Sequence, residues 1–429
     1  MRSSYIYKPE NIDLFKTRVL HWAKNFNHVF FLNSNNYSKI NKAGTSYHNF
    51  ESVIATGCIE ELFSNQNSFS KFGNLINYKD WLFGYLSYDL KNETENLTSS
   101  NYDGIKANNL HFICPEFVFI FSNTDVKIEH FCASPEKIIK DIEQIIPHEE
   151  KTNHIEIKNR ISKHEYLDCV SKLKEHIQYG DIYEVNYCQE FYSEDKEVNP
   201  LQLYNKLNSL SPTPFSCFMR TNDIYLMSAS PERFLKKTGN KIISQPIKGT
   251  IKRGNSPGED LNLKNKLLND EKERSENVMI VDLVRNDLSK TAKKDSVKVE
   301  ELFGIYSFSQ VHHIISTISS RVDSKYNITD IIESAFPMGS MTGAPKIRAM
   351  ELIEKYEKTK RGIYSGSVGY ITPEGDFDFN VVIRSIIYNS SRRYLSFSTG
   401  GAITSGSVPE KEYEECLLKA DAMKRILKN

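Results

Sequence analysis

Short apolar runs with a two-residue period recur along the chain and predict strands rather than helices. The clearest are WLFGYLSYDL, FICPEFVFIFS, FSCFMR, IYLMSAS, KIISQPI, VKVEELF, VHHIISTISS, SGSVGYIT, FNVVIRSIIY and YLSFST. Helical segments punctuate these runs without alternating with them, which argues against a doubly wound or barrel arrangement of parallel strands. The pattern predicts an α+β fold with large, mostly antiparallel sheets.

Helical periodicity is strongest in the middle and at the end of the chain. Apolar residues recur at helical spacing from Tyr166 to Ile177, and Gly180 follows as a helix-end signal. KIIKDIEQII predicts a shorter helix before that point. The change of pattern near residue 150 separates a mixed module, residues 1–150, from the remainder.

Composition narrows the class of protein. The 429 residues carry 55 Lys+Arg and 55 Asp+Glu, so no global field attracts nucleic acid or an anionic membrane. No apolar run reaches the length of a membrane span. The seven cysteines are odd in number and never spaced C-x-x-C, which argues against a disulfide framework or a structural cysteine-zinc site. A cytoplasmic enzyme with reduced thiols is expected.

Two E-x-x-E pairs lie on the apolar sides of predicted helices. Glu273 and Glu276 share a face with Ile280, and Glu412 and Glu415 border another buried stripe. Carboxylates facing a core require a cation, and oxygen-only ligands favour Mg²⁺. The alternative is charge at the edge of an amphipathic helix, with Lys419 as the i,i+4 partner of Glu415.

Several other polar residues stand in restricted settings. Lys248 lies between Ile247 and Gly249 in SQPIKGTIKRG, and Arg384 interrupts the predicted strand NVVIRSIIY. A buried arginine needs an anion, and a substrate carboxylate would serve. His313 falls on the polar face of a strand, which is usually a structural position and sometimes a functional one.

Two glycine-rich stretches are predicted as loops ahead of helices, where free N–H groups attract anions. PMGSMTGAPKIRAMELI places Thr342 before Pro345, and STGGAITSGS contains Gly400 and Gly401. Together with the acidic pairs and the cations, these loops predict a pocket for a small polyanionic acid.

The residues at these positions resemble, in order, the blocks of the chorismate-utilising enzymes. The similar blocks cover about residues 160–427 and are GDIYEVNYCQEF, SASPERFL, QPIKGTIKRG, ERSENVMIVDLVRND, MTGAPKIRAMELI, RGIYSGSVGYI, VVIRS and STGGAITSGSVPEKEYEECLLKADAM. FGYLSYDL and FLNSNNY also resemble the N-terminal region of anthranilate synthase and aminodeoxychorismate synthase large subunits. The resemblance implies two large sheets with outer helices around a central active site.

The resemblance also implies roles for individual residues. Mg²⁺, holding the ring carboxylate of chorismate, would be bound by Glu273, Glu276, Glu412 and Glu415. Of these, Glu276 and Glu415 are expected to be direct ligands. Contacts to the substrate carboxylates are implied for Tyr364, Arg384, Gly400, Gly401 and Lys419. The implied catalytic residues are Glu232 as general acid, His313 and Thr342 beside the ring and the departing 4-hydroxyl, and Lys248.

Lys248 distinguishes two branches of this family. PIKGT resembles the aminodeoxychorismate synthase branch, whose lysine is a proposed nucleophile on ring C2, whereas anthranilate synthases carry alanine there. A nucleophilic lysine must be neutral. We expect burial and Mg²⁺ to favour that form, together with the neighbouring Lys252 and Arg253 if these point inward. The expected activity is amination of chorismate to 4-amino-4-deoxychorismate, for 4-aminobenzoate and folate. Alternatives are anthranilate synthesis and a non-catalytic scaffold that binds chorismate or a partner.

Three features of the resemblance leave questions open. Glu184 stands where amino-transferring relatives have glutamine and water-adding relatives have lysine, so it either orients ammonia or is a neutral substitution. Glutaminase motifs are absent from the sequence, so a separate glutamine amidotransferase subunit is expected to supply ammonia. FLNSNNY lies where relatives bind tryptophan, and its role is either structural or regulatory.

Overall fold

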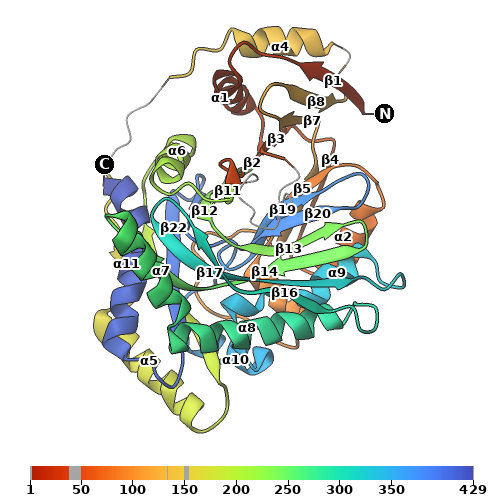
Figure 1. The fold of residues 1–429 in the computed structure, drawn as a ribbon. Coiled ribbons are helices and arrows are strands. Elements are labelled where there is room, and N and C mark those ends of the chain that lie inside the picture. The colour runs from red at the N-terminus through yellow and green to blue at the C-terminus, as the bar shows by residue number, and fades with distance from the viewer. Residues whose placement is uncertain (1, 38–49, 133, 149–153, 429) are drawn as a thin grey trace.

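A computed structural model describes residues 2–37, 50–132, 134–148 and 154–428 and shows two large sheets with helices outside them (Figure 1). Every ladder between the named strands of these residues is antiparallel, including the broad pairing of β10 (Glu184–Ser193) with β22 (Tyr394–Ile403). The prediction of an α+β fold is confirmed.

The first sheet has 12 strands within the described residues and draws on both ends of the chain. In spatial order its path is β1 (Ser3–Tyr7), β8 (Val126–His130), β7 (Phe117–Phe121), β3 (Ser52–Thr56), β2 (His28–Asn33), β11 (Phe215–Thr221), β12 (Ile224–Ser230), β21 (Ser385–Asn389), β22, β10 and β18 (Gly343–Ala344), with β9 (Lys158–Asn159) paired to β10.

The second sheet has 10 strands in the same described part of the chain. Its path is β15 (Ile247–Lys252), β17 (Val311–Arg321), β14 (Lys241–Gln245), β13 (Arg233–Thr238), β20 (Phe377–Asn380), β19 (Ser367–Ile371), β5 (Leu82–Leu86), β6 (Leu110–Cys114) and β4 (Glu60–Ser64), with β16 (Lys298–Ser307) paired to β17. Strands from residues 1–150 therefore enter both sheets. The division into 1–150 and 160–427 stays a sequence-based prediction.

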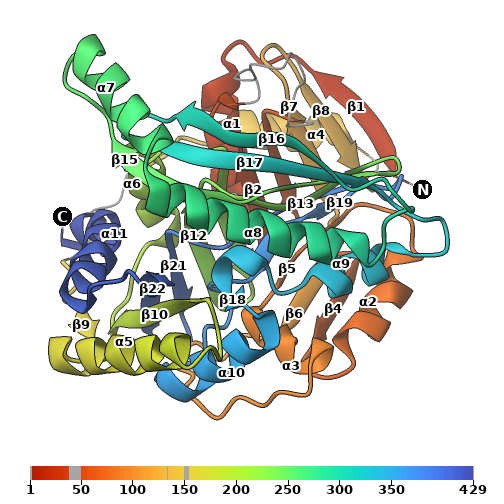
Figure 2. The ribbon, with the colours of Figure 1, turned by 60° about the horizontal axis from the view of Figure 1, so that its bottom comes forward.

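Helices cover the outer faces and the edges of the sheets (Figure 2). They are α1 (Ile12–Ala23), α2 (Ser68–Ile76), α3 (Lys91–Thr94), α4 (Pro135–Glu143), α5 (Lys163–Gln178), α6 (Pro200–Leu210), α7 (Pro257–Leu268), α8 (Glu271–Ser289), α9 (Ile328–Ala335), α10 (Lys346–Tyr356) and α11 (Pro409–Lys428). Helix α8 packs on β15 and β17, and α11 packs on β22. Among the described helices, none combines the length and the apolar character needed to traverse a lipid bilayer.

Local sequence signals account for the helix predicted from Tyr166 onward. Ser162 and Glu165 form a capping box at the start of α5, which satisfies N–H groups that the first turn would otherwise leave open. The helix ends at Gln178, and Gly180 follows with φ of +81°, a conformation that favours glycine. The predicted helix and its end signal are confirmed.

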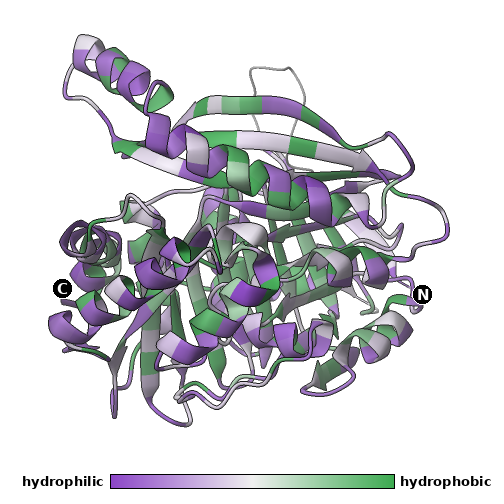
Figure 3. Cartoon of the chain, turned by 90° about the horizontal axis from the view of Figure 1, so that it is seen from below, coloured by the Kyte–Doolittle hydropathy of each residue, from purple (hydrophilic) through white to green (hydrophobic). Residues whose placement is uncertain are grey.

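Two hydrophobic cores hold the layers together. One contains side chains from both sheets, such as Phe30 and Phe83, and from α8 and α9. The other lies between the first sheet and its outer helices and includes Phe15, Tyr187 and Met423. Apolar positions accordingly face inward and the outer helix faces are hydrophilic (Figure 3). Burial of this apolar surface is the main force holding the sheets together.

Two of the connections that carry the chain from one sheet to the other are adjacent. One follows β12 and leads through Glu232 into β13, and the other links β20 to β21 through Arg384. They are hydrogen bonded to each other, because Val381 N donates to Glu232 O at 3.0 Å and Ala229 N donates to Arg384 O at 3.0 Å. The predicted strand FNVVIRSIIY is thus wrong as a single element. Arg384 lies in its central turn, with φ of +49°.

The N-terminal FLNSNNY segment contributes a polar network at the end of β2. Asn35 Nδ2 donates to Asn208 Oδ1 at 2.9 Å and to Thr213 O at 2.8 Å. Ser216 Oγ donates to Asn208 Oδ1 at 2.7 Å. These bonds tie the segment to α6 and β11, which gives it a structural role in the first sheet.

A buried ion pair joins neighbouring strands of the second sheet. The Arg233 guanidinium on β13 donates from Nε to Asp378 Oδ1 at 2.9 Å and from NH2 to Oδ2 at 3.0 Å. The Arg233 side chain has no exposed surface, and that of Asp378 is 7% exposed. Removing one charge of such a pair leaves the other buried without compensation.

We predict that Asp378→Asn lowers the free energy of unfolding by about 3 kcal/mol, because the Arg233 charge stays buried without its counter-ion. Chemical denaturation monitored by circular dichroism measures the change. The matched control is Asp421→Asn, which breaks the exposed Asp421–Arg425 pair on α11 and should cost less than about 0.5 kcal/mol. Equal effects of the two variants would contradict the assignment of Asp378 to a buried pair.

Candidate active site

The two sheets meet at Lys248 and Glu184. Lys248 lies on β15 of the second sheet and Glu184 begins β10 of the first. The Lys248 Nζ is 2.6 Å from Glu184 Oε1, and the two side chains are 9% and 1% exposed. The other carboxylate oxygen of Glu184 is buried and makes no hydrogen bond within the described residues. This ion pair forms one wall of the candidate site.

The Lys248 amine is charged in this state. Burial alone would lower its pKa, but the carboxylates of Glu184, Glu276 and Glu232 outweigh burial and raise the pKa above the ordinary lysine value. The neighbouring cations do not meet the condition under which they would lower the pKa of Lys248. Lys252 is exposed, and Arg253 donates from Nε to Asp260 Oδ1 at 2.7 Å. A neutral Lys248 therefore requires proton transfer, and Glu184 is the adjacent acceptor.

Glu232 is held on the first connection between the sheets with 4% exposure. Burial raises the pKa of its carboxyl to about 7, against the opposing pull of the Lys248 and Arg384 cations. A carboxyl with such a pKa can hold a proton near neutral pH and give it to a leaving group. The predicted general acid thus has the protonation behaviour that the role needs.

Arg384 reaches the site from the second connection and makes no ion pair with any residue in the described ranges. Its NH2 donates to His313 Nε2 at 3.5 Å, while His313 Nδ1 lies 2.7 Å from Thr250 Oγ1. Burial and the Arg384 charge hold the pKa of His313 well below its usual range. The imidazole is therefore neutral, and the guanidinium is available to an incoming carboxylate.

The four predicted acidic residues converge from α8 and α11 around Lys272, which the sequence analysis missed. Lys272 Nζ lies 3.7 Å from Glu276 Oε1 and 3.7 Å from Glu412 Oε1, so its ammonium bridges the two helices. Burial opposes its charge, yet Glu276, Glu412, Glu273 and Glu415 together raise its pKa. The i,i+4 spacing of Lys272 and Glu276 was the available signal.

This acidic cluster fits a hard divalent cation. Glu276 Oε1 is buried without a hydrogen bond among the described residues, and burial raises the pKa of that carboxyl to about 7. A bound cation would stabilise the charged form of such a buried carboxylate. An all-carboxylate donor set suits Mg²⁺. The inward orientation predicted for Glu276 and Glu412 is confirmed by their exposures of 8% and 4%.

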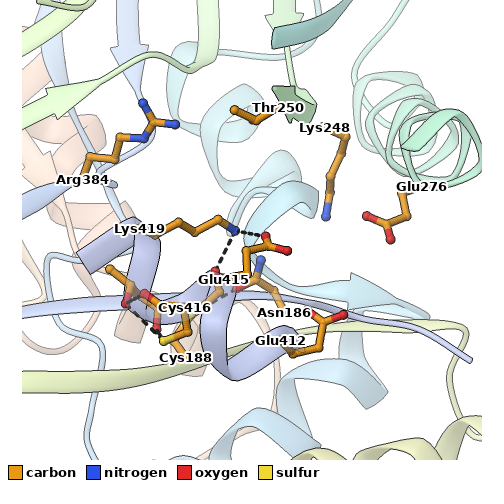
Figure 4. Close-up of polar contacts among 12 residues, drawn as sticks. Asn186, Cys188, Lys248, Thr250, Glu276, Arg384, Glu412, Glu415, Cys416 and Lys419 are labelled. Atoms are coloured by element: carbon orange, nitrogen blue, oxygen red, sulfur yellow. Dashed lines mark hydrogen bonds and ion pairs between the residues drawn. The ribbon is translucent and has the colours of Figure 1, made fainter. Parts of the chain in front are cut away.

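Lys419 lies across the site from Lys248 (Figure 4). Lys419 Nζ is 2.7 Å from Glu415 Oε1 and donates to Gly400 O at 2.9 Å. The prediction of a loop at Gly400 and Gly401 is wrong, because both lie inside β22. A Cβ at Gly400 would stand 1.9 Å from Tyr187 O, so the glycine is required by close strand contact.

Gly401 opens the floor of the site toward α11. A Cβ added there would lie 3.3 Å from Glu412 Oε2, 3.7 Å from Glu415 Oε1 and 3.8 Å from Lys419 Nζ. The missing side chain at Gly401 therefore leaves room between the strand and these charged groups.

Thr342 and Tyr364 are buried below these charges. Thr342 Oγ1 lies 3.3 Å from Met338 O and 3.2 Å from Gly339 O, so its proton is shared with the backbone of its own turn. Tyr364 Oη is 3.4 Å from Cys188 Sγ on β10. Both residues therefore contact β10, and the roles that the sequence predicts for them at the substrate stay predictions.

The buried ion pair of Arg361 and Glu357 positions β10 and was not found from the sequence. The Arg361 guanidinium donates to Glu357 Oε1 at 2.6 Å, to Asn186 O at 2.7 Å and to Met341 O at 2.6 Å. Glu357 Oε1 in turn accepts from Cys188 N at 2.9 Å. The pair therefore holds β10 against the turn that carries Thr342.

Comparison with known proteins gives consistent matches. A model of the chorismate binding enzyme family matches residues 27–425. The chain is 33% identical to aminodeoxychorismate synthase component 1 of Bacillus subtilis (strain 168), over 80% of this chain and 76% of that protein. It is 34% identical to anthranilate synthase component 1 of Aquifex aeolicus (strain VF5), over 81% of this chain and 74% of that protein.

Among solved structures, anthranilate synthase component I from Streptococcus pneumoniae TIGR4 aligns with a TM-score of 0.78 at 25% identity. The alignment covers 91% of this chain and 96% of that one. Two differently named synthases are thus similar to this chain at nearly equal identity. Overall similarity does not choose between them, and the choice falls to individual residues of the site.

The raised pKa of Glu232 predicts a pH-dependent cost in stability. Between the ordinary carboxyl pKa of about 4.3 and the folded value of about 7, the folded state keeps a proton that the unfolded state releases. Stability contributed by this group is therefore lost as pH rises through that window. Glu232→Gln should match the parent chain near pH 4.5 and exceed its unfolding free energy at pH 8, by on the order of 2–3 kcal/mol.

Urea denaturation at the two pH values measures this difference. Glu410→Gln, at an exposed position on α11, is the control and should show no pH-dependent gain. A gain for Glu232→Gln that is the same at both pH values would contradict the assignment.

Proposed function

The chain belongs to the family of chorismate binding enzymes, and we propose that it is the large subunit of an Mg²⁺-dependent aminodeoxychorismate synthase. It would convert chorismate and ammonia to 4-amino-4-deoxychorismate, a precursor of 4-aminobenzoate and folate. The observation that carries the proposal is Lys248, buried at the meeting of the two sheets with its amine 2.6 Å from Glu184. The resemblance assigns alanine to this position in anthranilate synthases.

Two cations are suited to the carboxylates of chorismate. Arg384 makes no ion pair with any described residue, and its guanidinium can hold a carboxylate through two parallel bonds. Lys419 stands on the far side beside Gly400 and Gly401, with Tyr364 at the β10 wall. We assign these residues to binding and orienting the substrate.

Mg²⁺ would be held by Glu273, Glu276, Glu412 and Glu415 after Lys272 gives up its bridging position. When bound, the ion would neutralise the substrate's ring carboxylate and polarise the ring. The buried Glu276 oxygen without a hydrogen bond supports this assignment.

The first half of the proposed reaction uses three groups of the chain. Glu184 takes a proton from Lys248, and the freed amine forms a bond to ring C2. Both double bonds of the ring shift, from C1–C2 to C1–C6 and from C5–C6 to C4–C5. The C4–O bond breaks, and Glu232 gives its proton to the departing hydroxyl, which leaves as water. His313 and Thr342 line the space beside the ring and that hydroxyl.

The second half reverses the movement of electrons. Ammonia forms a bond to C4 and passes a proton to the Glu232 carboxylate. Both double bonds shift back to C5–C6 and C1–C2, the bond between Lys248 and C2 breaks, and the amine regains its proton from Glu184. Chorismate and ammonia are thereby converted to 4-amino-4-deoxychorismate and water. The buried free oxygen of Glu184 offers an acceptor that orients the incoming ammonia.

A glutamine amidotransferase subunit would supply the ammonia, as the names of relatives that are called a component 1 suggest. A reducing, cytoplasmic setting is part of the proposal, and all seven cysteines are free.

Anthranilate synthesis is the second candidate function, supported by the relatives and the solved structure of that name. That reaction places the amine at C2 and releases pyruvate, so it has no use for a lysine that occupies C2. The burial of Lys248 against Glu184 favours the first proposal.

The purified chain with chorismate, Mg²⁺ and ammonium should form a non-fluorescent product that a 4-amino-4-deoxychorismate lyase converts to 4-aminobenzoate. Chromatography and fluorescence measure the products, and replacing Mg²⁺ by EDTA should stop the reaction. Fluorescent anthranilate as the main product would overturn the proposed function.

We predict that Lys248→Ala reduces formation of the 4-amino product at least 100-fold, because the C2 nucleophile is lost. The matched control is Lys252→Ala, which removes an exposed lysine from the same strand and should keep full activity. Initial rates with saturating ammonium measure both variants. Undiminished 4-amino product from Lys248→Ala would refute the nucleophile while leaving the overall activity in place.

A further inference from the structure

A second cluster of chemistry-bearing side chains lies outside the candidate active site. His28 begins β2 of the first sheet, while Glu61 on β4 and His111 on β6 belong to the second sheet. Strands β4 and β6 pair so that Phe63 faces His111 and Glu61 faces Ile113, which puts Glu61 and His111 on one face as diagonal neighbours. The cluster thus joins the two sheets.

The three side chains present their ligand atoms to one point. His111 Nε2 is 2.9 Å from Glu61 Oε1, His28 Nε2 is 3.5 Å from the same oxygen, and all three atoms lie within 4.8 Å of one another. Around a tetrahedral zinc with bonds of about 2.0–2.1 Å, neighbouring ligand atoms are separated by about 3.3 Å. The two distances to Glu61 Oε1, 2.9 Å and 3.5 Å, lie on either side of that value.

The buried ring of His28 supplies an independent observation, because it has few polar contacts. Its Nδ1 is buried and makes no hydrogen bond among the described residues, and its Nε2 is beyond good hydrogen-bond length from Glu61. Burying a polar ring with so few polar contacts costs free energy. A metal ion at Nε2 would replace the long contact to Glu61 by a coordinate bond and fix the orientation of the ring.

We propose that His28, Glu61 and His111 bind one divalent transition-metal ion of the zinc class, which fastens the first sheet to the second. Two imidazoles and one carboxylate form a recognised zinc donor set, with the remaining position open to water. Mg²⁺ prefers carboxylate ligands and zinc-class ions accept imidazole. This site is therefore chemically distinct from the acidic cluster on α8 and α11.

The surroundings suit this ion. The histidine side chains are 7% and 4% exposed, whereas the Glu61 side chain is 30% exposed and gives the ion a path from solvent. Burial lowers the pKa of both imidazoles, that of His111 to about 4, which leaves them in the neutral form that binds metal. The nearby Arg220 guanidinium is turned aside, donating from NH1 to Lys24 O at 2.9 Å.

The test uses the full chain, freed of metal with EDTA and then kept in excess Mg²⁺. Zn²⁺ is titrated by calorimetry, bound metal is counted by elemental analysis, and Co²⁺ absorption reports the coordination geometry. We expect one tight Zn²⁺ per chain, a tetrahedral Co²⁺ spectrum and a Zn²⁺-dependent rise in the thermal midpoint.

His111→Gln and Glu61→Gln should each weaken Zn²⁺ binding at least tenfold and remove the rise in the thermal midpoint. The matched control is His176→Gln. His176 on α5 also contacts a carboxylate, Asp181, but within the described part of the chain it belongs to no cluster of metal-binding side chains. Chorismate amination in Mg²⁺ and ammonium should stay unchanged in His111→Gln. Equal Zn²⁺ binding by the parent chain and His111→Gln would overturn the proposal, as would the absence of Zn²⁺ binding at micromolar concentrations.

Discussion

The buried ion pair between Lys248 and Glu184 is the contact on which the candidate active site depends. The two partners belong to different sheets, so the 2.6 Å contact exists only when the two sheets are correctly placed. Taking both charges out of water is costly, and a hydrophobic pair would hold the sheets together at least as well. The pair is therefore better explained by chemistry than by stability, because it holds an amine beside a proton acceptor in a site shielded from water.

The electrostatic balance of the site follows from this arrangement. Burial raises the pKa values of Glu232 and Glu276 to about 7, and the neighbouring Glu184 adds to the rise at Glu276. Lys272 compensates part of the negative charge by bridging α8 and α11. Such a site is prepared for a divalent cation on the acidic side and for carboxylates on the side of Arg384. Its two halves have opposite charge preferences, which would orient an asymmetric anion.

Periodic features of the site could be predicted from the sequence, and long-range pairings could not. The inward faces of α8 and α11 follow from the 3.6-residue period, so Glu276 and Glu412 were found without a structure. Nothing local marks Arg384 as the turn between two sheets, because the Arg384–Ser385 pair stands between β-branched, apolar residues, Ile383 and Ile386. The sequence predicted a loop at Gly400, because only the close contact with the partner strand β10 explains a glycine inside a strand. The contact of Glu184 with Lys248 joins residues 64 positions apart, beyond any local pattern.

The order of the strands also determines when the site can exist during synthesis. Strands β4, β5 and β6 come early in the chain but pair through β5 with β19, and Glu412, Glu415 and Lys419 lie on α11, the last helix. A nascent chain on the ribosome therefore holds unfinished sheet edges until nearly all residues have emerged. Folding dominated by such distant pairings is slow, so the emerging chain needs protection of those edges until α11 closes over β22. Catalytic competence arrives in a single late step, when the last helix docks.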